Sequence, residues 1–276
     1  MRNFKFLILL CALSLACNNG KLPSTLGDPE NSAPYGYQPL DPLPITGIFL
    51  KNDSSAYGSL DIKTRVMRAL PCETVRLAEG KIETNGSIKF GTTKTGYAGS
   101  DYQIIIDYIK YDTKSVALKI IPNSSTDKNS SDLNFEPFES FYDSSLPDAV
   151  VPVYIGIGLR LTATINVKSG NIDLGNLFGL GVAAEAKKIT GSLTIQTLGI
   201  SGPNISPLIP IPSEINTTTI ENAISALSSI KAKMFEPDVQ VNPGVIGFYN
   251  NIGGGQKTVN KFISTFLLKK LPFPIP

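Results

Sequence analysis

The chain has 276 residues, of which 42% are hydrophobic, and it carries 25 Lys and Arg against 23 Asp and Glu, with no histidine and no tryptophan. This composition is typical of a folded protein and too apolar for an intrinsically disordered one. The absence of histidine excludes Ser-His-Asp and Cys-His nucleophile systems, imidazole metal ligands and histidine pH switches. Carboxylate, lysine, tyrosine and backbone chemistry remain.

Residues 1–16 have the pattern of a secretory signal peptide. Arg2 and Lys5 form a basic start, and residues 6–16 form an apolar stretch. A membrane-spanning helix needs about 20 apolar residues, so this stretch is too short to cross a bilayer. Polar residues follow immediately after Cys17, which indicates a segment that is removed by cleavage.

The residues at the predicted cleavage point, Leu13-Ser14-Leu15-Ala16-Cys17, resemble the lipobox of bacterial lipoproteins. In that family a small residue precedes a cysteine that is lipidated and becomes the mature N-terminus. Ala16 and Cys17 match these positions, whereas Ser14 stands where the family prefers leucine. The resemblance implies lipidation of Cys17, and Asn18 after it is similar to lipoproteins that are sorted to the outer membrane. The alternative is an ordinary secretory signal with an incidental cysteine.

Cleavage before Cys17 would change the charge and the cysteine content of the chain. It would leave 23 basic and 23 acidic residues, so a concentrated basic surface and nucleic-acid binding are not expected. Cys17 and Cys72 would be the remaining cysteines. Because Cys17 is predicted to carry lipid, no internal disulfide is expected. Cys72, which is followed by Glu73, is expected to be a half-buried structural thiol.

The first half of the mature chain is predicted to be a tether followed by strands. Residues 17–44, rich in Pro, Gly and Ser after the lipidated cysteine, are predicted to be the tether. Residues 45–122 alternate between apolar and polar side chains, which predicts a small all-β sandwich with one strand from Leu60 to Val66. Asn85-Gly86 predicts a hairpin with a type I′ turn, in which both residues have positive φ. This run of short strands resembles the immunoglobulin-like and prealbumin-like modules of bacterial surface proteins, a resemblance of fold alone.

The second half is predicted to be an α+β domain. Residues 123–148 are polar and then aromatic, and they are predicted to link the sandwich to a domain at 149–276. In that domain an alternating strand runs from 150 to 167, and apolar residues at helical spacing predict helices from Thr218 to Glu236 and from Val259 to Leu267. Thr218 and Glu221 are expected to form the capping box of the first helix. Two helices on a mainly antiparallel sheet make the expected fold class α+β overall.

The sequence predicts no catalytic residue, no metal site and no cofactor. Glu136 with Glu139, or Asp143 with Asp148, are the carboxylate pairs that a secreted glycosidase-like hydrolase would use, which is one alternative function. Such enzymes commonly stack sugars on tryptophan, which this chain lacks.

Two further motifs are incomplete. Gly156-Ile157-Gly158 lacks the third glycine of a dinucleotide-binding loop, so these glycines are expected to permit a close approach of strands or helices. The loop that begins at Asp127 lacks the central glycine and the final glutamate of an EF-hand. An irregular calcium site there is an alternative to a solvated loop, which we favour.

The C-terminal segment allows a second alternative function. Residues 258–276 combine an amphipathic helix with an apolar tail, and residues 174–186 are rich in glycine and alanine, as in a membrane-perturbing or pore-forming protein. We favour the interpretation that the apolar helix face covers the sheet, with Phe262, Ile263, Phe266 and Leu267 as its members.

The expected function is that of a lipid-anchored protein of the bacterial cell envelope, at the outer membrane, acting as a binding or structural module. The expected partners are the membrane, through the N-terminal lipid, and a protein or glycan ligand on the cell surface.

Overall fold

A computed structural model describes residues 36–50, 58–86, 88–90, 95–121, 133–138, 146–178, 185–253 and 256–276. The predicted signal peptide, Cys17 and the tether up to residue 35 lie outside these ranges, as do Glu139, Asp143 and the loop that begins at Asp127. Within them, the structure is α+β, with mainly antiparallel strands and three α-helices, so the predicted fold class is confirmed.

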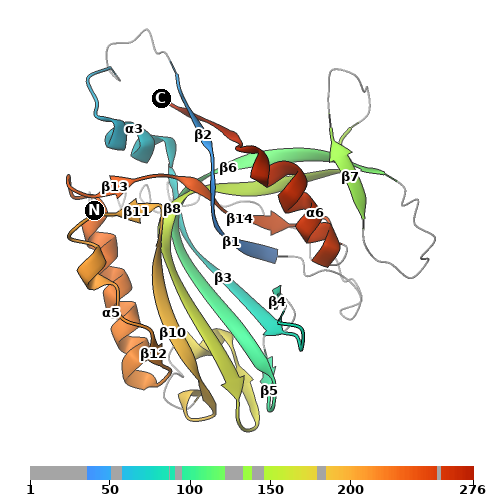
Figure 1. Cartoon of the computed structure of the whole chain (residues 1–276), viewed down its shortest axis with the longest axis vertical. Helices are drawn as coiled ribbons and strands as arrows, with labels where there is room; N and C mark the ends of the chain where they lie inside the picture. Colours follow the sequence, from blue (N-terminus) through green and yellow to red (C-terminus); the bar gives the residue numbers. More distant parts are fainter. Residues whose placement is uncertain are drawn as a thin grey trace, which may run out of the picture. The chain divides into compact units, whose positions relative to one another are not determined.

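Two long strands form the centre of the main sheet (Figure 1). β6 (Asp101–Ile121) and β8 (Ala149–Val167) pair antiparallel from Asp101 opposite Asn166 to Leu118 opposite Ala149. Both strands are rich in β-branched residues, which favour extended backbone. The odd-numbered side chains of β8 from Val151 to Val167 are all buried, so one face of this strand lies wholly in the core.

Each outer edge of this central pair has two different partners along its length. β8 pairs with β14 through residues 153–156 and with β10 through residues 158–167, while β6 pairs with β3 and, at its far end, with β7. The sheet has nine strands in the order β1-β14-β8-β6-β3-β4, with β10, β12 and β7 off this path. The bounds of the additional strands are β1 (Gly36–Pro44), β3 (Cys72–Ile82), β4 (Ile88–Phe90), β7 (Asn134–Pro137), β10 (Ile189–Leu198), β12 (Ser213–Glu214) and β14 (Gly244–Asn250).

Short elements complete the described structure. Three two-stranded sheets pair β2 (Thr46–Phe49) with β15 (Pro272–Ile275), β5 (Thr95–Tyr97) with β9 (Asn171–Asp173), and β11 (Ile200–Ser201) with β13 (Gln240–Val241). The 3₁₀ turns are η1 (Gly175–Phe178), η2 (Ser206–Leu208) and η3 (Leu267–Lys269). The C-terminal residues therefore belong to a strand, and Phe273 and Ile275 in it are buried.

Gly156 and Gly158 lie where β8 changes its partner from β14 to β10. A Cβ atom at either position would come within 2.2 Å of a backbone oxygen of β6, that of Lys110 for Gly156 and that of Tyr108 for Gly158. Only glycine fits at so short a distance. The predicted role of these glycines in a close approach of strands is confirmed.

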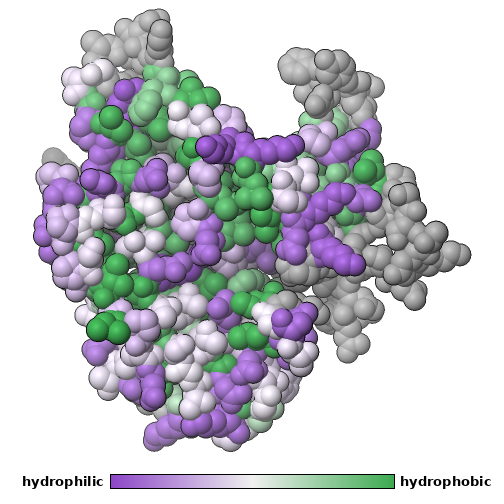
Figure 2. Space-filling model, in the orientation of Figure 1, coloured by the Kyte–Doolittle hydropathy of each residue, from purple (hydrophilic) through white to green (hydrophobic). Residues whose placement is uncertain are grey.

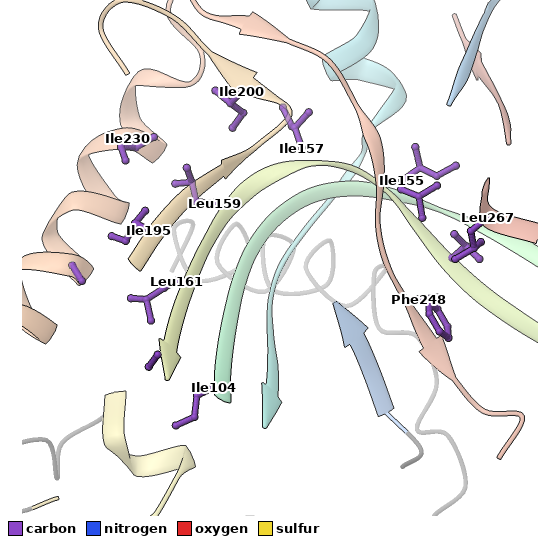
Figure 3. Close-up of a cluster of buried hydrophobic side chains, with 14 of the residues drawn as sticks. Ile104, Ile155, Ile157, Leu159, Leu161, Ile195, Ile200, Ile230, Phe248 and Leu267 are labelled. Atoms are coloured by element: carbon purple, nitrogen blue, oxygen red, sulfur yellow. The ribbon is translucent and has the colours of Figure 1, made fainter. Parts of the chain in front are cut away.

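The main hydrophobic core covers one face of the sheet on both sides of this point. Figure 3 shows Leu159, Leu161 and Ile195 with Ile230 of α5 in one group, and Ile155 and Phe248 with Leu267 in the other. Helix α5 (Thr217–Lys233) packs against β10 and β8. Helix α6 (Gln256–Phe266) covers the second group with its own apolar face.

Both helices predicted in the second half are confirmed, with one change at the start of α5. Asn216 is the N-cap: its side chain accepts a hydrogen bond from the Thr219 backbone N–H, and the Asn216 N–H donates to Thr219 Oγ1, each at 2.9 Å. The predicted capping box of Thr218 and Glu221 is wrong, because Asn216 precedes them and an asparagine side chain satisfies the first N–H groups well.

The strand predicted from Leu60 to Val66 is wrong, because this segment starts helix α3 (Ile62–Ala69). The Asp61 carboxylate caps the helix by accepting from the Thr64 backbone N–H at 3.0 Å and from Thr64 Oγ1 at 2.6 Å. Val66 and Leu70 are buried one helical turn apart, whereas Ile62 is 66% exposed.

The two-domain division at residues 123–148 also differs from the structure. Strands of the predicted sandwich, β3, β4 and β6, lie in the same sheet as β8, β10 and β14 of the predicted α+β domain, and the described residues belong to one compact unit. An immunoglobulin-like or prealbumin-like sandwich is not confirmed. The reason is the length of β6, whose pairing with β8 joins the two segments along the whole strand.

Two local predictions need correction. Residues 36–44, predicted as the end of the tether, form β1, which pairs with β14, and Tyr37 is buried. The hairpin at residues 80–90 is confirmed, but its turn differs from type I′. Lys270 is the one non-glycine residue with positive φ among those described, so Asn85 does not adopt it, and Gly86 (φ 81°) does so alone.

Candidate functional site

The carboxylates predicted for a hydrolase do not form a pair in the described part of the chain. Glu136 is exposed on β7, and the exposed Asp148 accepts a hydrogen bond from the Ile120 backbone N–H at 2.7 Å. Their predicted partners, Glu139 and Asp143, lie outside the described residues. The residues that the structure describes also contain no group of three or more Cys, Asp or Glu that could hold a metal ion. Cys72 is half-buried, as predicted.

A buried charged cluster lies on the face of the sheet opposite the main core. Asp107 of β6 and Arg160 of β8 are directly opposite each other, and they are 0% and 3% exposed. Arg160 donates to both carboxylate oxygens of Asp107 at 2.7 Å, from Nε and from one terminal nitrogen. The Tyr37 hydroxyl of β1 donates to the same carboxylate at 2.6 Å. No spacing in the sequence indicates this cluster, because only the pairing of the strands brings these three residues together.

The surroundings of this cluster raise the pKa values of two of its members, Tyr37 and Arg160. Burial of the Tyr37 hydroxyl, together with the Asp107 carboxylate beside it, raises the pKa of Tyr37 well above its usual value. Burial lowers the pKa of Arg160, but its hydrogen bonds and charge interaction with Asp107 outweigh that effect and raise it. The charged groups are paired and inaccessible to a substrate. We therefore assign the cluster to structure, where it attaches β1 to the central strands.

The raised pKa of Tyr37 predicts a loss of stability at alkaline pH. A group whose pKa is raised by folding stabilises the folded state fully below its unfolded value, about 10, and loses that contribution as the pH rises through the folded value. We expect the free energy of unfolding, measured by urea titration, to fall above about pH 10 and to fall less steeply in Tyr37→Phe. Tyr108 and Tyr154, whose pKa values are raised by burial, would supply the remaining slope. Equal slopes in the two proteins would contradict the assignment.

The accessible candidate site is a cleft of about 880 Å³ between α3 and the segment that follows α5. Its lining residues are Asp61, Ile62, Lys63, Thr64, Met67, Arg68, Lys110, Phe235, Pro237, Val239, Gln240 and Val241. Ligand sites of proteins commonly have volumes of about 300–1,000 Å³. Figure 2 shows apolar and hydrophilic surface interspersed over the region of α3. We call this hollow the α3 cleft.

Local sequence explains how the walls of the α3 cleft form. On α3, Lys63 and Met67 are one turn apart, as are Thr64 and Arg68, so these four share a side of the helix. On the opposite wall, a turn closed by the Val239 N–H donating to the Glu236 oxygen brings the chain back after α5. The Lys63 ammonium also donates to the Glu236 oxygen, which connects the two walls.

The lining of the α3 cleft combines apolar surface with positive charge. Phe235 is 53% exposed and Ile62 is 66% exposed, which is unusual for large apolar side chains. The cations are Lys63, Arg68 and Lys110, against the single carboxylate of Asp61.

Three of these charged groups have hydrogen-bond or ion-pair partners within the protein. Hydrogen bonds from Thr64 lower the pKa of Asp61 and engage its carboxylate as a helix cap. The partner of Lys63 is a neutral carbonyl, which leaves its charge in place. Lys110 lies 3.6 Å from Glu73, whose carboxylate also accepts a hydrogen bond from the Tyr108 hydroxyl at 2.7 Å. The cleft lining therefore carries charges of both signs, and the Glu73 carboxylate beside the lining offsets the charge of Lys110.

A second hollow, of about 230 Å³, lies between β10 and α5. The described residues that line it, among them Leu193, Ile195 and Ala223, include no charged side chain. The α3 cleft is larger and has the greater chemical variety, so we take it as the candidate binding site.

No protein-family model matches the chain, and searches of curated proteins and of solved structures found no significant match. Among the helices that the structure describes, none has the length and apolar character needed to cross a membrane.

Proposed function

We propose that the protein is a lipid-anchored binding module of the bacterial cell envelope, with acyl chains on Cys17 and its ligand in the α3 cleft. The anchor rests on the signal pattern of residues 1–16 and on the lipobox resemblance at Leu13-Ser14-Leu15-Ala16-Cys17. The observation that carries the binding role is the α3 cleft itself, which presents exposed apolar side chains next to charged side chains in one hollow.

The two alternative functions have less support. A carboxylate hydrolase needs two convergent carboxylates, and in the described residues Asp107, the fully buried carboxylate, is engaged by Arg160. A membrane-perturbing protein needs an apolar surface that is free to insert, and Phe262, Phe266 and Leu267 are buried against the sheet, with Ile263 packed beside them. A binding module is the function that these side-chain positions favour.

The anchor is tested by detergent partitioning and intact mass of the natively expressed protein. We expect the wild type to enter the detergent phase with a mass raised by acyl chains, and Cys17→Ser to remain in the aqueous phase without that mass, because each buried CH₂ contributes about 0.8 kcal/mol to membrane binding. Cys11→Ser is the matched control and should partition like the wild type, since bulky Leu10 precedes that cysteine. A wild type that is soluble and unacylated would overturn the anchor.

A further inference from the structure

A second group of polar side chains lies beside the buried charged cluster, around Arg76 of β3. Arg76 is directly opposite Asp107 in the pairing of β3 with β6, so both side chains are on the face of the sheet away from the main core. The oxygens of Asp107 are engaged by Arg160 and Tyr37. Among the described residues, no carboxylate forms an ion pair with Arg76. The positive charge of Arg76 is therefore not neutralised by an ion pair in this part of the chain.

The guanidinium of Arg76 lies against two tyrosine rings. Its central carbon is 4.6 Å from the ring centroid of Tyr154 and 5.8 Å from that of Tyr111. The two rings pack edge to face, with centroids 5.3 Å apart. One terminal nitrogen of Arg76 donates to the Tyr111 hydroxyl at 3.3 Å, whereas Nε is buried and has no hydrogen-bond partner within the described ranges. A buried N–H without an acceptor is costly, and such a group commonly marks the place of a bound water or ion.

Three tyrosine hydroxyls belong to the same group. Burial raises the pKa of Tyr154, the charge of Arg76 opposes this shift, and the nearby Tyr111 and Tyr249 add to it. Tyr154 is therefore a protonated donor at neutral pH. In the part of the chain that the structure describes, the hydroxyls of Tyr154 and Tyr249 have no hydrogen-bond acceptor. Arg76 and Tyr249 are half-buried, so one side of the group reaches the solvent.

We propose that this group, which we call the Arg76 site, binds a phosphate group through Arg76 and the three tyrosine hydroxyls. The chemistry of the donors carries the inference, because a guanidinium and protonated hydroxyls fit a ligand that only accepts hydrogen bonds, as an oxyanion does. Four donor side chains match the several oxygens of a phosphate better than the two of a carboxylate. A cation is disfavoured, because the rings of Tyr111 and Tyr154 that could bind it already face the Arg76 guanidinium.

The Arg76 site is separate from the α3 cleft, so the inference goes beyond the proposed function. Lys110 lines the cleft and forms an ion pair with Glu73 of β3. Glu73 and Arg76 are three residues apart on this strand, which places their side chains on opposite faces of the sheet. A result at one site therefore does not decide the other.

The experiment is a calorimetric titration of the full chain carrying Cys17→Ser, whose residue 17 cannot be acylated, with inorganic phosphate in a chloride buffer free of other oxyanions. We expect saturable binding of one phosphate per chain with a Kd below about 1 mM, weaker at high salt because the contact is electrostatic. A parallel titration with glycerol 3-phosphate distinguishes two sources of the phosphate group. Tighter binding of this ester would assign the site to organic phosphates, and equal or weaker binding would assign it to the free ion.

Three variants and two matched controls locate the site. Arg76→Gln should raise the Kd for phosphate at least about tenfold, and Arg76→Lys, which keeps the charge without the forked donors, by a smaller factor. Tyr154→Phe should raise it about fivefold, since it removes one hydroxyl and keeps the ring. The controls are Lys187→Gln and Tyr97→Phe, at exposed positions elsewhere, which should bind like the parent. Circular dichroism of all five checks that they fold, and Tyr154→Phe keeps the test decisive if Arg76→Gln does not.

Two results would overturn the inference. The first is the absence of saturable phosphate binding by the parent chain. The second is a Kd that Tyr154→Phe and the folded Arg76 variants leave unchanged, which would place the bound phosphate elsewhere on the protein. Neither result bears on the proposed function, because the α3 cleft lies on the other face of the sheet and the anchor is decided by the partitioning of Cys17→Ser.

Discussion

Replacing Arg160 with methionine is expected to lower the free energy of unfolding by about 3–5 kcal/mol, because it leaves the Asp107 carboxylate buried without its cationic partner. Asp107 is fully buried, and Arg160 supplies two of its hydrogen bonds, both at 2.7 Å. The Tyr37 hydroxyl would still donate to this carboxylate. Urea unfolding curves with unchanged slope would measure the loss directly.

The double variant Asp107→Leu with Arg160→Met separates the cost of a buried carboxylate without a cation from the contribution of the ion pair itself. Apolar residues in place of a buried ion pair are often neutral or stabilising, so we expect the double variant to recover more than half of the stability lost by Arg160→Met. Lys187→Met, at an exposed position, is the control and should change stability by less than about 0.5 kcal/mol. An Arg160→Met variant as stable as this control would show that the pair does not carry the attachment of β1.

The second large effect is expected for Phe262→Ala in α6, at about 3–5 kcal/mol of destabilisation. Phe262 is fully buried and lies at the centre of an aromatic group, with ring centroids at 4.9 Å from Phe248, 5.3 Å from Phe266 and 6.3 Å from Phe135. The truncation would leave a cavity between α6 and the sheet that rigid strands cannot close. Thermal and urea unfolding would both report the loss.

This variant also separates a core role of α6 from a membrane role. Leu268→Ala, which follows α6 and is 56% exposed, should leave stability within about 0.5 kcal/mol of the wild type. If Phe262→Ala kept full stability but abolished leakage from liposomes caused by the wild type, α6 would be a membrane contact. If the wild type causes no leakage and Phe262→Ala is less stable than the wild type, the result would support packing of α6 on the sheet.

An element could be predicted from the sequence where the spacing of its apolar residues matches the face that it buries. The alternation of β8 between Leu159 and Val167 matches one fully buried face, and the helical spacing of Ile220, Ala223 and Ile230 matches the buried side of α5. The failure at α3 has the same physical basis. The apolar spacing of this stretch of eight residues fits a strand and a helix alike, and the Asp61 cap at its start decides for the helix.

The candidate site was predictable only in its residue types. Lys63 and Met67 are local neighbours on one helix, but Lys110 is on β6 and Phe235 follows α5, so no spacing in the chain indicates that they line one cleft. The buried cluster is similar, because Asp107 and Arg160 are 53 residues apart and the register of β6 with β8 makes them opposite. Residues 36–44 were expected to be tether because their prolines suppress periodicity, although Tyr37 inserts into that cluster.

The amino-acid sequence is enough to exclude histidine chemistry and to predict an exported, lipid-anchored chain and the class of the fold, because composition and short-range periodicity are local properties. Three features become visible only in the folded chain: one sheet spans both halves, Asp107, Arg160 and Tyr37 form one buried cluster, and α3 borders a cleft lined by charged and apolar side chains. These features depend on contacts between residues far apart in the chain. Strand register and helix packing set those contacts, and neither is encoded within a single segment.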